Sequence, residues 1–346
     1  MRRPRFSGTV LARLVANVLA FATKDGLNRE ALLEGAGLTE RDLAPPDSYL
    51  PFSALVAVWQ LIAKAKAGFD PEFGIRWGAA VRARDLGLLG YAMAYSANLE
   101  MALLRLVRYG RILTDTVQFE METPHTRRRA IAARAHAGLG AALPFAVDSR
   151  LAALLAACRE ITGVAIIPVE VTFTYAQPRS IAEHHRFFRC ALRFKQRESK
   201  LIFLERDFRL PVTRGDEALA GYLSEHAEHV LRTLTTGAST RERVRSAIWA
   251  LLTEGRPTLD HVATALQMPP RTLQRHLARE GTSLHQEIEH IRKAMALATL
   301  QGRALAIDEL AFLLGYTEPS SFYRSFKRWT GRTPRQYRLA AAALAS

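Results

Sequence analysis

Apolar residues recur every three or four positions over the first third of this 346-residue chain. That spacing places them on one side of a helix, so it predicts a series of amphipathic helices. The expected helices span residues 8–23, 29–35, 53–66, 71–81 and 86–106.

A different pattern begins after residue 116, where apolar and polar residues alternate. Alternation puts successive side chains on opposite faces and is typical of a half-buried strand. The expected strands span residues 117–121, 130–135, 169–175, 192–194 and 201–204, and helices are expected at 145–161 and 180–188. Because helices and short strands intermix, we predict an α+β fold for residues 1–212.

From residue 213 onward the pattern is helical to the end of the chain. A long helix is predicted at 216–236, and the small polar stretch Thr-Thr-Gly-Ala-Ser-Thr predicts a linker after it. We therefore divide the chain into an N-terminal domain (1–212), a helix and linker (213–238) and an all-α domain (239–346). The long helix carries an apolar stripe that suits either pairing of two copies or packing within its own domain. The stripe consists of Leu219, Leu223, Val230 and Leu234.

Two helix-turn-helix patterns lie in tandem in the all-α domain. In the first, a short helix is predicted at 259–266, and Pro270 starts a second helix that ends before Gly281. Leu273 and Leu277 lie one turn apart and would pin this second helix to the first. Its other face carries Arg271, Gln274, Arg275 and Arg279. Arginine can pair with guanine and glutamine with adenine, so this face is a candidate base-reading surface; the alternative is a helical hairpin with a solvated basic face.

The second pattern repeats the first after residue 306. A short helix at 307–314 ends at Gly315, and the next helix is predicted to bury Phe322, Phe326 and Trp329. Its outward-facing residues are Ser320, Ser321, Tyr323, Arg324 and Lys327. The chain from Pro319 onward contains Arg and Lys but no Asp or Glu. Such a positively charged stretch is expected of a surface that contacts phosphate. Thr333 is the expected N-cap of a final helix.

The run LAFLLGYTEPSSFYRSFKRWTGRTPRQYR resembles the signature of the AraC/XylS family of bacterial transcription regulators. Its Gly-Tyr, Ser-x-Phe-x-Arg-x-Phe-Lys and Gly-x-Thr-Pro elements occur in the family's order and spacing. The resemblance implies that a long central helix, here residues 283–300, holds the two units apart. It also implies that both recognition helices enter successive major grooves on one face of the duplex.

The same resemblance implies which residues read bases. The candidates are Arg271, Gln274 and Arg275 in the first unit and Ser320, Ser321, Tyr323 and Arg324 in the second. Arg279 and Lys327 complete the candidate DNA contacts, and whether Tyr323 meets a base or a phosphate stays open. Where the family commonly has a capping serine, this chain has Pro269, so we expect a slightly looser entry into the first recognition helix.

The region from about residue 20 to 210 resembles the arabinose-binding-type sensor domain of a subgroup of these regulators. The resemblance lies in Phe73-Gly-Ile-Arg-Trp-Gly, Asp85-Leu-Gly-Leu-Leu-Gly-Tyr and Arg186-Phe-Phe-Arg-Cys with Arg193-Phe. It implies a small-molecule effector without identifying it. The candidate effector-binding residues are Tyr91, Tyr95, Arg105 and Tyr109. Apolar walls with a few polar groups make a ligand pocket, but buried core tyrosines give the same pattern.

The formal net charge is +15, and basic residues are abundant in both domains, so strongly salt-dependent DNA affinity is expected. The two cysteines, Cys158 and Cys190, lack metal-ligand spacing. His184 and His185 diverge on a helix, and the pair His226 and His229 is expected on a solvated helix face. The usual phosphate-loop, dinucleotide and hydrolase motifs are missing. We therefore expect no metal, no cofactor and no catalytic residue, and a protein that is not an enzyme.

The expected partners are double-stranded promoter DNA, a small-molecule effector and RNA polymerase, with a homodimer as a possibility. No apolar stretch reaches membrane-spanning length and no signal peptide is recognised, so a cytoplasmic location without membrane contact is expected. An enzyme fused to a similar DNA-binding domain would need a reactive cysteine motif that this sequence lacks. An architectural DNA binder without an effector remains an alternative. Target promoters and the sign of regulation are not given by the sequence.

Overall fold

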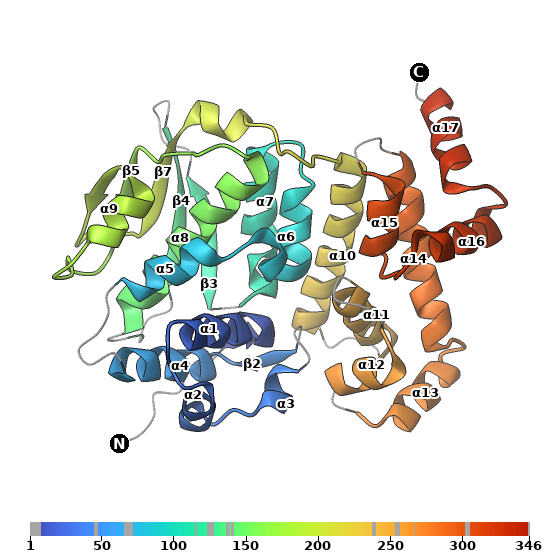
Figure 1. Cartoon of the computed structure of the whole chain (residues 1–346), viewed down its shortest axis with the longest axis horizontal. Coiled ribbons are helices and arrows are strands. Elements are labelled where there is room, and N and C mark those ends of the chain that lie inside the picture. Colours follow the sequence, from blue (N-terminus) through green and yellow to red (C-terminus); the bar gives the residue numbers. More distant parts are fainter. Residues whose placement is uncertain are drawn as a thin grey trace. The chain divides into compact units, whose positions relative to one another are not determined.

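The computed structural model describes residues 8–44, 48–65, 72–114, 116–122, 128–135, 139, 142–236, 240–252, 257–266, 268–301 and 305–344. The chain separates into two compact units (Figure 1). The first consists of Met1–Ala94 with Asn98–Thr213, and the second of Tyr95–Ala97 with Arg214–Ser346.

The first unit combines helices with a mixed sheet, as the α+β prediction requires. Its α-helices are α1 (Ala12–Lys24), α2 (Arg29–Ala36), α3 (Glu40–Leu43), α4 (Phe52–Ala65), α5 (Phe73–Ala80), α6 (Gly87–Ala94), α7 (Leu99–Tyr109), α8 (Leu143–Thr162) and α9 (Ala182–Phe188). Its 3-10 helices are η1 (Ala83–Leu86), η2 (Gly110–Ile112) and η4 (Glu205–Arg209). Its strands are β1 (Thr9–Leu11), β2 (Tyr49–Pro51), β3 (Val117–Glu122), β4 (Arg128–Ala135), β5 (Glu170–Thr172), β6 (Ala191–Arg193) and β7 (Lys200–Leu204).

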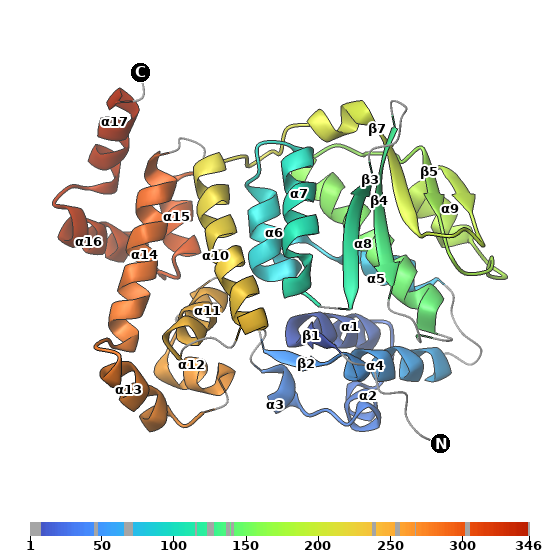
Figure 2. The same ribbon diagram turned by 180° about the vertical axis from the view of Figure 1, so that it is seen from behind.

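Five strands form one sheet in the order β3-β4-β7-β5-β6. The pairs are antiparallel except β5 with β6, which is parallel. Each of the five predicted strands is present. A half-buried strand can be recognised in a sequence because its side chains alternate between the buried and the exposed face. The helix α8 lies against this sheet and contacts β4 (Figure 2).

Two predictions for the first unit are wrong in detail. Residues 9–11 were predicted as helix but form β1, which pairs with β2 in the register Thr9 to Pro51. Val10 and Leu11 are buried in this strand, and burial at adjacent positions looks alike in a helix and a strand. The predicted helix 86–106 is divided into α6 and α7, because Asn98 caps α7 by accepting a 3.0 Å hydrogen bond from the Met101 amide.

The apolar interior of the first unit consists of two clusters that share α8. One cluster gathers side chains from α7, α8 and the sheet, with Leu151 and Phe203 fully buried. The other gathers side chains from α1, α4 and α5, and Phe145 of α8 stacks on Phe73 in it at 5.3 Å between ring centroids. The helix α8 therefore holds the two halves of the unit together.

Glycines allow α5 to approach α8 very closely. A Cβ atom at Gly74 would lie 2.9 Å from the carbonyl oxygen of Phe145, and one at Gly78 would collide with the carbonyl oxygen of Ser149. Any larger side chain at these positions would push the two helices apart.

The second unit is all helical, as predicted. It contains α10 (Glu217–Thr236), α11 (Thr240–Leu252), α12 (Leu259–Ala265), α13 (Pro270–Arg279), α14 (Leu284–Gln301), α15 (Ile307–Leu313), α16 (Pro319–Thr330) and α17 (Pro334–Leu344). The helix α10 contacts α14 and α11; the Tyr222 hydroxyl donates a 3.4 Å hydrogen bond to the Ile291 carbonyl. Leu219 and Leu223 are buried, whereas Leu234 is 43% exposed. Much of the predicted stripe thus packs within the chain, and pairing of two copies through α10 stays a prediction.

Candidate nucleic-acid interface

The first helix-turn-helix unit consists of α12 and α13. Thr258 caps α12 by accepting a 3.2 Å hydrogen bond from the His261 amide, and the Met268 amide closes the turn on the Ala263 carbonyl at 3.0 Å. Pro270 occupies the first turn of α13, where its missing amide costs no hydrogen bond. Pro269 precedes the helix and makes no side-chain cap, as its chemistry requires.

The two faces of α13 differ sharply in burial. Leu273 and Leu277 are buried, as predicted from their spacing. The predicted base-reading residues Arg271, Gln274 and Arg275 are all exposed, as is Arg279. Within the described part of the chain no hydrogen bond or ion pair engages these four side chains. Their donors are therefore available to another molecule.

The second unit consists of α15 and α16, and its turn contains Gly315 at φ +72°, a conformation that favours glycine. The Tyr316 amide closes the turn on the Ala311 carbonyl at 3.0 Å. Phe322 and Phe326 are completely buried, with ring centroids 5.7 Å apart. These two aromatic rings anchor α16 as the sequence predicted, whereas Trp329, which was also expected on the buried face, is half-buried.

The outer face of α16 carries the remaining predicted DNA contacts. Ser320, Arg324 and Lys327 are exposed, and Ser321 and Tyr323 are half-buried. Arg324 donates a 3.2 Å hydrogen bond to the Ser321 hydroxyl, so part of this face is tied to itself. Tyr323 lies beside Phe322, with ring centroids 6.2 Å apart.

The helix α14 is tied to α11 and to the end of the α13–α14 connection through Glu287. This carboxylate is buried and accepts hydrogen bonds from Arg241 at 2.8 Å, Arg245 at 2.6 Å and the Thr282 hydroxyl at 2.7 Å. Burial raises its pKa, but the hydrogen bonds from Arg245 and Thr282 outweigh that effect, so the pKa lies below the ordinary value. The pair of arginines on α11 therefore holds an ionised carboxylate near the start of α14.

Glu289, two residues further along α14, is tied to the second unit. Its carboxylate accepts hydrogen bonds from the Trp329 indole at 2.7 Å and from Arg328 at 2.8 Å. Burial again raises the pKa of Glu289, and these two donors bring it below the ordinary value. Arg292 adds a third tie by donating to the carbonyls of Leu314 at 2.9 Å and Gly315 at 3.2 Å.

These three α14 residues were missed from the sequence. Their charges at positions 287, 289 and 292 look like an ordinary solvated helix face, and their partners lie far away along the chain. The signal available was an unusual clustering of arginine before the first unit, at 241, 243 and 245. The predicted N-cap Thr333 is confirmed: its hydroxyl accepts a 3.3 Å hydrogen bond from the Gln336 amide.

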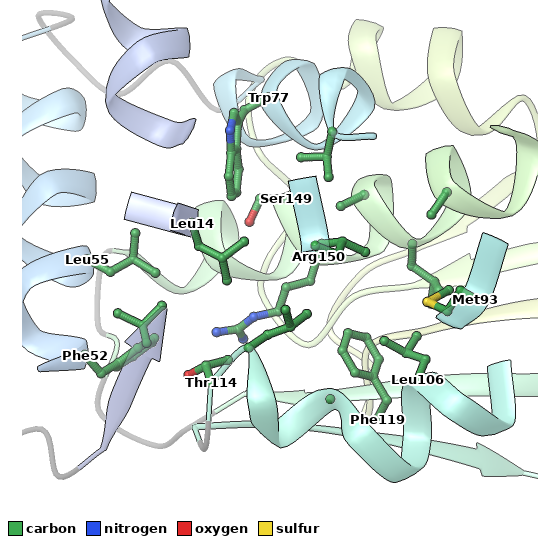
Figure 3. A pocket seen from close by; sticks show the side chains of 18 of the residues that line it. Leu14, Phe52, Leu55, Trp77, Met93, Leu106, Thr114, Phe119, Ser149 and Arg150 are labelled. Atoms are coloured by element: carbon green, nitrogen blue, oxygen red, sulfur yellow. The ribbon is translucent and has the colours of Figure 1, made fainter. Parts of the chain in front are cut away.

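The N-terminal structural unit, Met1–Ala94 with Asn98–Thr213, contains a cavity of about 100 Å³. Its wall is almost entirely apolar and includes Leu14, Leu55, Trp77, Met93 and Phe119 (Figure 3). It lies at the seam between the two apolar clusters, because both contribute to its wall. Arg150 of α8 also lines it, and sequence reasoning missed this residue. A charged residue in the middle of an apolar helix was the signal that could have found it.

The four predicted effector contacts lie elsewhere. Tyr95 and Arg105 are 3% and 8% exposed, and Tyr91 and Tyr109 are half-buried. None of the four lines this cavity. Their assignment to an effector stays a prediction.

One histidine, His226, occupies different surroundings from those expected, whereas His184 and His185 diverge as predicted. His226 was predicted on a solvated face, but it is buried and its ring stacks on Trp249 at 4.5 Å. His184 is fully buried beside Asp148, with Nε2 and Oδ2 3.2 Å apart, whereas His185 is exposed. Among the residues described here, no group of three or more His, Cys, Asp or Glu side chains is placed to hold a metal ion. No described helix has the length and hydropathy needed to cross a membrane.

Comparison with known proteins covers both units. Residues 26–212, more than half of the chain, match the family model described as the arabinose-binding domain of AraC transcription regulators, and residues 262–340 match a helix-turn-helix domain model. The chain is 30% identical over 326 residues to the ornithine utilization regulator of Pseudomonas aeruginosa, covering 93% of this chain and 94% of that protein. It is 29% identical over 295 residues to the HTH-type transcriptional regulator VirS of Mycobacterium tuberculosis, covering 83% and 84%. The crystal structure of the transcriptional regulator CdpR from Pseudomonas aeruginosa aligns with 94% of this chain and 98% of that one, at 20% identity and a TM-score of 0.48.

Proposed function

This chain belongs to the AraC family of transcription regulators, and from that premise we propose that it reads promoter DNA with the outer faces of α13 and α16 under the control of a small-molecule effector. The observation that carries the proposal is the set of four exposed, unengaged polar side chains on α13, a helix whose opposite face is pinned by buried leucines. A rigid helix with free guanidinium groups is suited to the major groove.

In this proposal Arg271, Gln274 and Arg275 read base edges, and Arg279 contacts the backbone. A bidentate arginine–guanine or glutamine–adenine pair contributes about 1–3 kcal/mol of discrimination against the wrong base. Ser320, Ser321, Tyr323 and Arg324 contact DNA from α16, and Lys327 contacts a phosphate.

The length of α14 supports binding across two grooves. Its 18 residues extend about 27 Å at 1.5 Å per residue. Figure 1 places α13 beyond one end of α14 and α16 beside its middle part, where Glu289 bonds to Arg328 and Trp329. Successive major grooves on one face of B-DNA are about 34 Å apart, so a spacer of this length suits two recognition helices in neighbouring grooves.

We propose that the N-terminal unit holds the effector in the cavity that α8 helps to line, and that occupation shifts the pairing or placement of the DNA-binding domains. The cavity supports this because an apolar hollow with very few polar groups is the usual form of a small-molecule site. RNA polymerase is the proposed protein partner and a homodimer the proposed assembly. We also propose that the protein is cytoplasmic and that it is not an enzyme.

The test is in-vitro selection of random duplex DNA on the full-length protein at near-physiological salt. We expect a motif with two enriched segments about one helical turn apart. The Arg275→Ala variant should lose base preference in one segment only. Arg41→Ala, which removes an exposed arginine of α3, is the matched control and should return the wild-type motif.

A different outcome would support the alternative of an architectural DNA binder. In that case the selection yields no motif, with or without candidate effectors, while the protein still binds DNA with a steep salt dependence. An unchanged motif for Arg275→Ala would instead show that α13 is not the reading helix.

A further inference from the structure

Arg150 stands out in the N-terminal structural unit because it is a half-buried cation in an apolar wall, and no described residue pairs with it. It lies in α8 and lines the apolar cavity together with residues of α1, α4, α5 and β3. Its Nη1 atom is buried and makes no hydrogen bond. Figure 3 shows the side chain extending into the cavity, with its guanidinium toward Thr114 and Phe52.

The surroundings of Arg150 offer no negative charge. Neither Asp nor Glu is among the described residues that line the cavity. The Thr114 and Ser149 hydroxyls donate to the carbonyls of Thr9 at 2.7 Å and Ala146 at 3.1 Å. Burial lowers the pKa of Arg150 to about 10, so the guanidinium remains protonated at neutral pH.

A second donor in the same cavity also lacks a partner. Trp59 of α4 lines the cavity, and its indole Nε1 is buried without a hydrogen bond. Leaving buried donors unpaired is costly, and leaving a buried cation unpaired is more so. The cavity thus contains two unpaired donors, and no acidic residue among those described lines it. A ligand with an anionic acceptor would satisfy these donors.

Given the sensing role proposed above, we propose that Arg150 is the anchor for the carboxylate of a small monoanionic effector whose apolar body fills the cavity. A guanidinium binds a carboxylate through two parallel hydrogen bonds, which is the strongest arrangement available to an arginine side chain. The rest of the wall offers apolar contact only.

The size and polarity of the cavity restrict the effector further. A cavity of about 150 Å³ holds a benzene molecule, so one of about 100 Å³ suits a single ring or a short chain. An ammonium group would be buried without an acceptor and would face the positive charge of Arg150. Ornithine, to which the name of one relative refers, carries such groups and is expected to be excluded.

Isothermal titration of the full-length protein tests this assignment with matched probes. Benzoate and hexanoate should bind, whereas benzyl alcohol, benzylamine and ornithine should bind at least about tenfold more weakly. Arg150→Met should weaken benzoate binding about 10- to 100-fold, and Arg150→Lys should retain part of the affinity. Arg111→Met, which removes an exposed arginine of η2, should bind benzoate like the wild type.

Thermal unfolding gives a second readout that a purely structural role would not produce. Without ligand, Arg150→Met should raise the melting temperature, because an apolar side chain of similar length replaces a half-buried, unpaired cation in an apolar wall. Benzoate should then raise the melting temperature of the wild type but not that of the variant. A structural arginine would give the opposite sign in the ligand-free protein.

Three outcomes would overturn the anchor: neither carboxylate binds, benzyl alcohol binds as tightly as benzoate, or Arg150→Met binds benzoate unchanged. The sensing role is tested separately by adding benzoate to the DNA-binding assay. Benzoate that binds without altering DNA affinity or motif removes the sensing role and leaves the anchor intact. DNA binding that responds to another effector, with no carboxylate bound, removes the anchor alone.

Discussion

The two helix-turn-helix units have the same plan but are anchored differently. Two leucines, Leu273 and Leu277, fix α13, whereas the fully buried rings of Phe322 and Phe326 fix α16. Aromatic rings bury more area than leucines, so the second unit has the larger apolar anchor. The ion pairs of α14 differ too, since Glu287 pairs with two arginines of α11 and Glu289 with one arginine of α16.

The outer faces of α13 and α16 differ in how far their arginines are already hydrogen-bonded within the chain. The guanidinium groups of Arg271 and Arg275 have no partner in the described part of the chain, whereas Arg324 is bonded to Ser321. A recognition group that is already engaged must exchange one hydrogen bond for another, so its net gain on binding DNA is smaller. If these faces bind DNA as proposed, we expect α13 to contribute more of the base discrimination than α16.

The largest expected effect comes from breaking the aromatic anchor. Phe326→Ala should destabilise the second unit by about 3–5 kcal/mol, because it removes a fully buried ring and leaves a cavity. Thermal unfolding of the full chain combined with hydrogen exchange in α16 measures this. Phe312→Ala, at a position that is 56% exposed, is the control and should change little. Equal losses for both variants would contradict the assigned core.

The next effect comes from the ionic tie between α14 and α11. Glu287→Ala should cost about 1.5–3 kcal/mol, since it removes charge-assisted hydrogen bonds to a buried carboxylate. Glu289→Ala should cost less, because that side chain is 21% exposed and pairs with one arginine. Chemical denaturation of the full chain compares the two. A larger loss for Glu289→Ala would reverse the ranking of the two ties.

Acid should weaken the ion pairs of both Glu287 and Glu289. The pKa values of Glu287 and Glu289 are lowered in the folded chain from the ordinary value of 4.5. Their stabilisation is therefore complete above pH 4.5 and is lost as the pH falls through the lowered pKa values. Melting temperatures measured against pH should fall in this range, and Glu287→Ala should flatten part of that fall. An identical pH profile for the variant would refute the assignment.

A comparable but more selective effect is expected from the reading face. Arg275→Ala should reduce discrimination at one base position by about 1–3 kcal/mol while leaving the stability of the fold unchanged. Ser320→Ala should change discrimination by less, because a neutral hydroxyl contact contributes about 0.5–1.5 kcal/mol. Binding to a set of single-base variants of the selected site measures both. Greater loss for Ser320→Ala would transfer the reading role to α16.

The smallest effect is expected from Lys327. Its exposed ammonium on α16 should contact phosphate, so Lys327→Ala should weaken binding to all sequences alike and reduce the salt slope by about one. Affinities measured over a range of salt concentrations test this. Lys293→Ala, which removes an exposed lysine of α14, should keep the wild-type slope. A change confined to one sequence would make Lys327 a base contact instead.

Local signals explain why the helices of the C-terminal structural unit could be predicted closely from the sequence. Pro270 begins α13 and Thr333 caps α17, and both act through their nearest neighbours in the chain. Glu287 could not be predicted, because its partners Arg241 and Arg245 lie 46 and 42 residues away. Sequence period identifies the buried face of a helix but not which charge on its border finds a partner.

The same limit applies to the sensor. The sequence predicts α8 as a helix from its apolar content, yet the surroundings of Arg150 come from α1, α4 and β3, which only tertiary packing brings together. The candidate effector contacts Tyr91, Tyr95, Arg105 and Tyr109 rest on residue type and on a shared helical region, and their assignment stays a prediction. An unpaired charge is a property of the packed chain, because it depends on which groups are absent from around it.

The glycine contact between α5 and α8 has a consequence for how this sensor can diversify. Position 78 accepts no Cβ atom and position 74 scarcely does, so these sites have almost no substitutional freedom. The backbone of α8 that carries Ser149 and Arg150 is thereby fixed, whereas cavity residues such as Leu14, Leu55 and Met93 are ordinary apolar side chains that tolerate exchange of shape. Substitutions at these apolar positions of this chain should therefore change the shape of the molecule that the cavity accepts without moving Arg150, its proposed anchor.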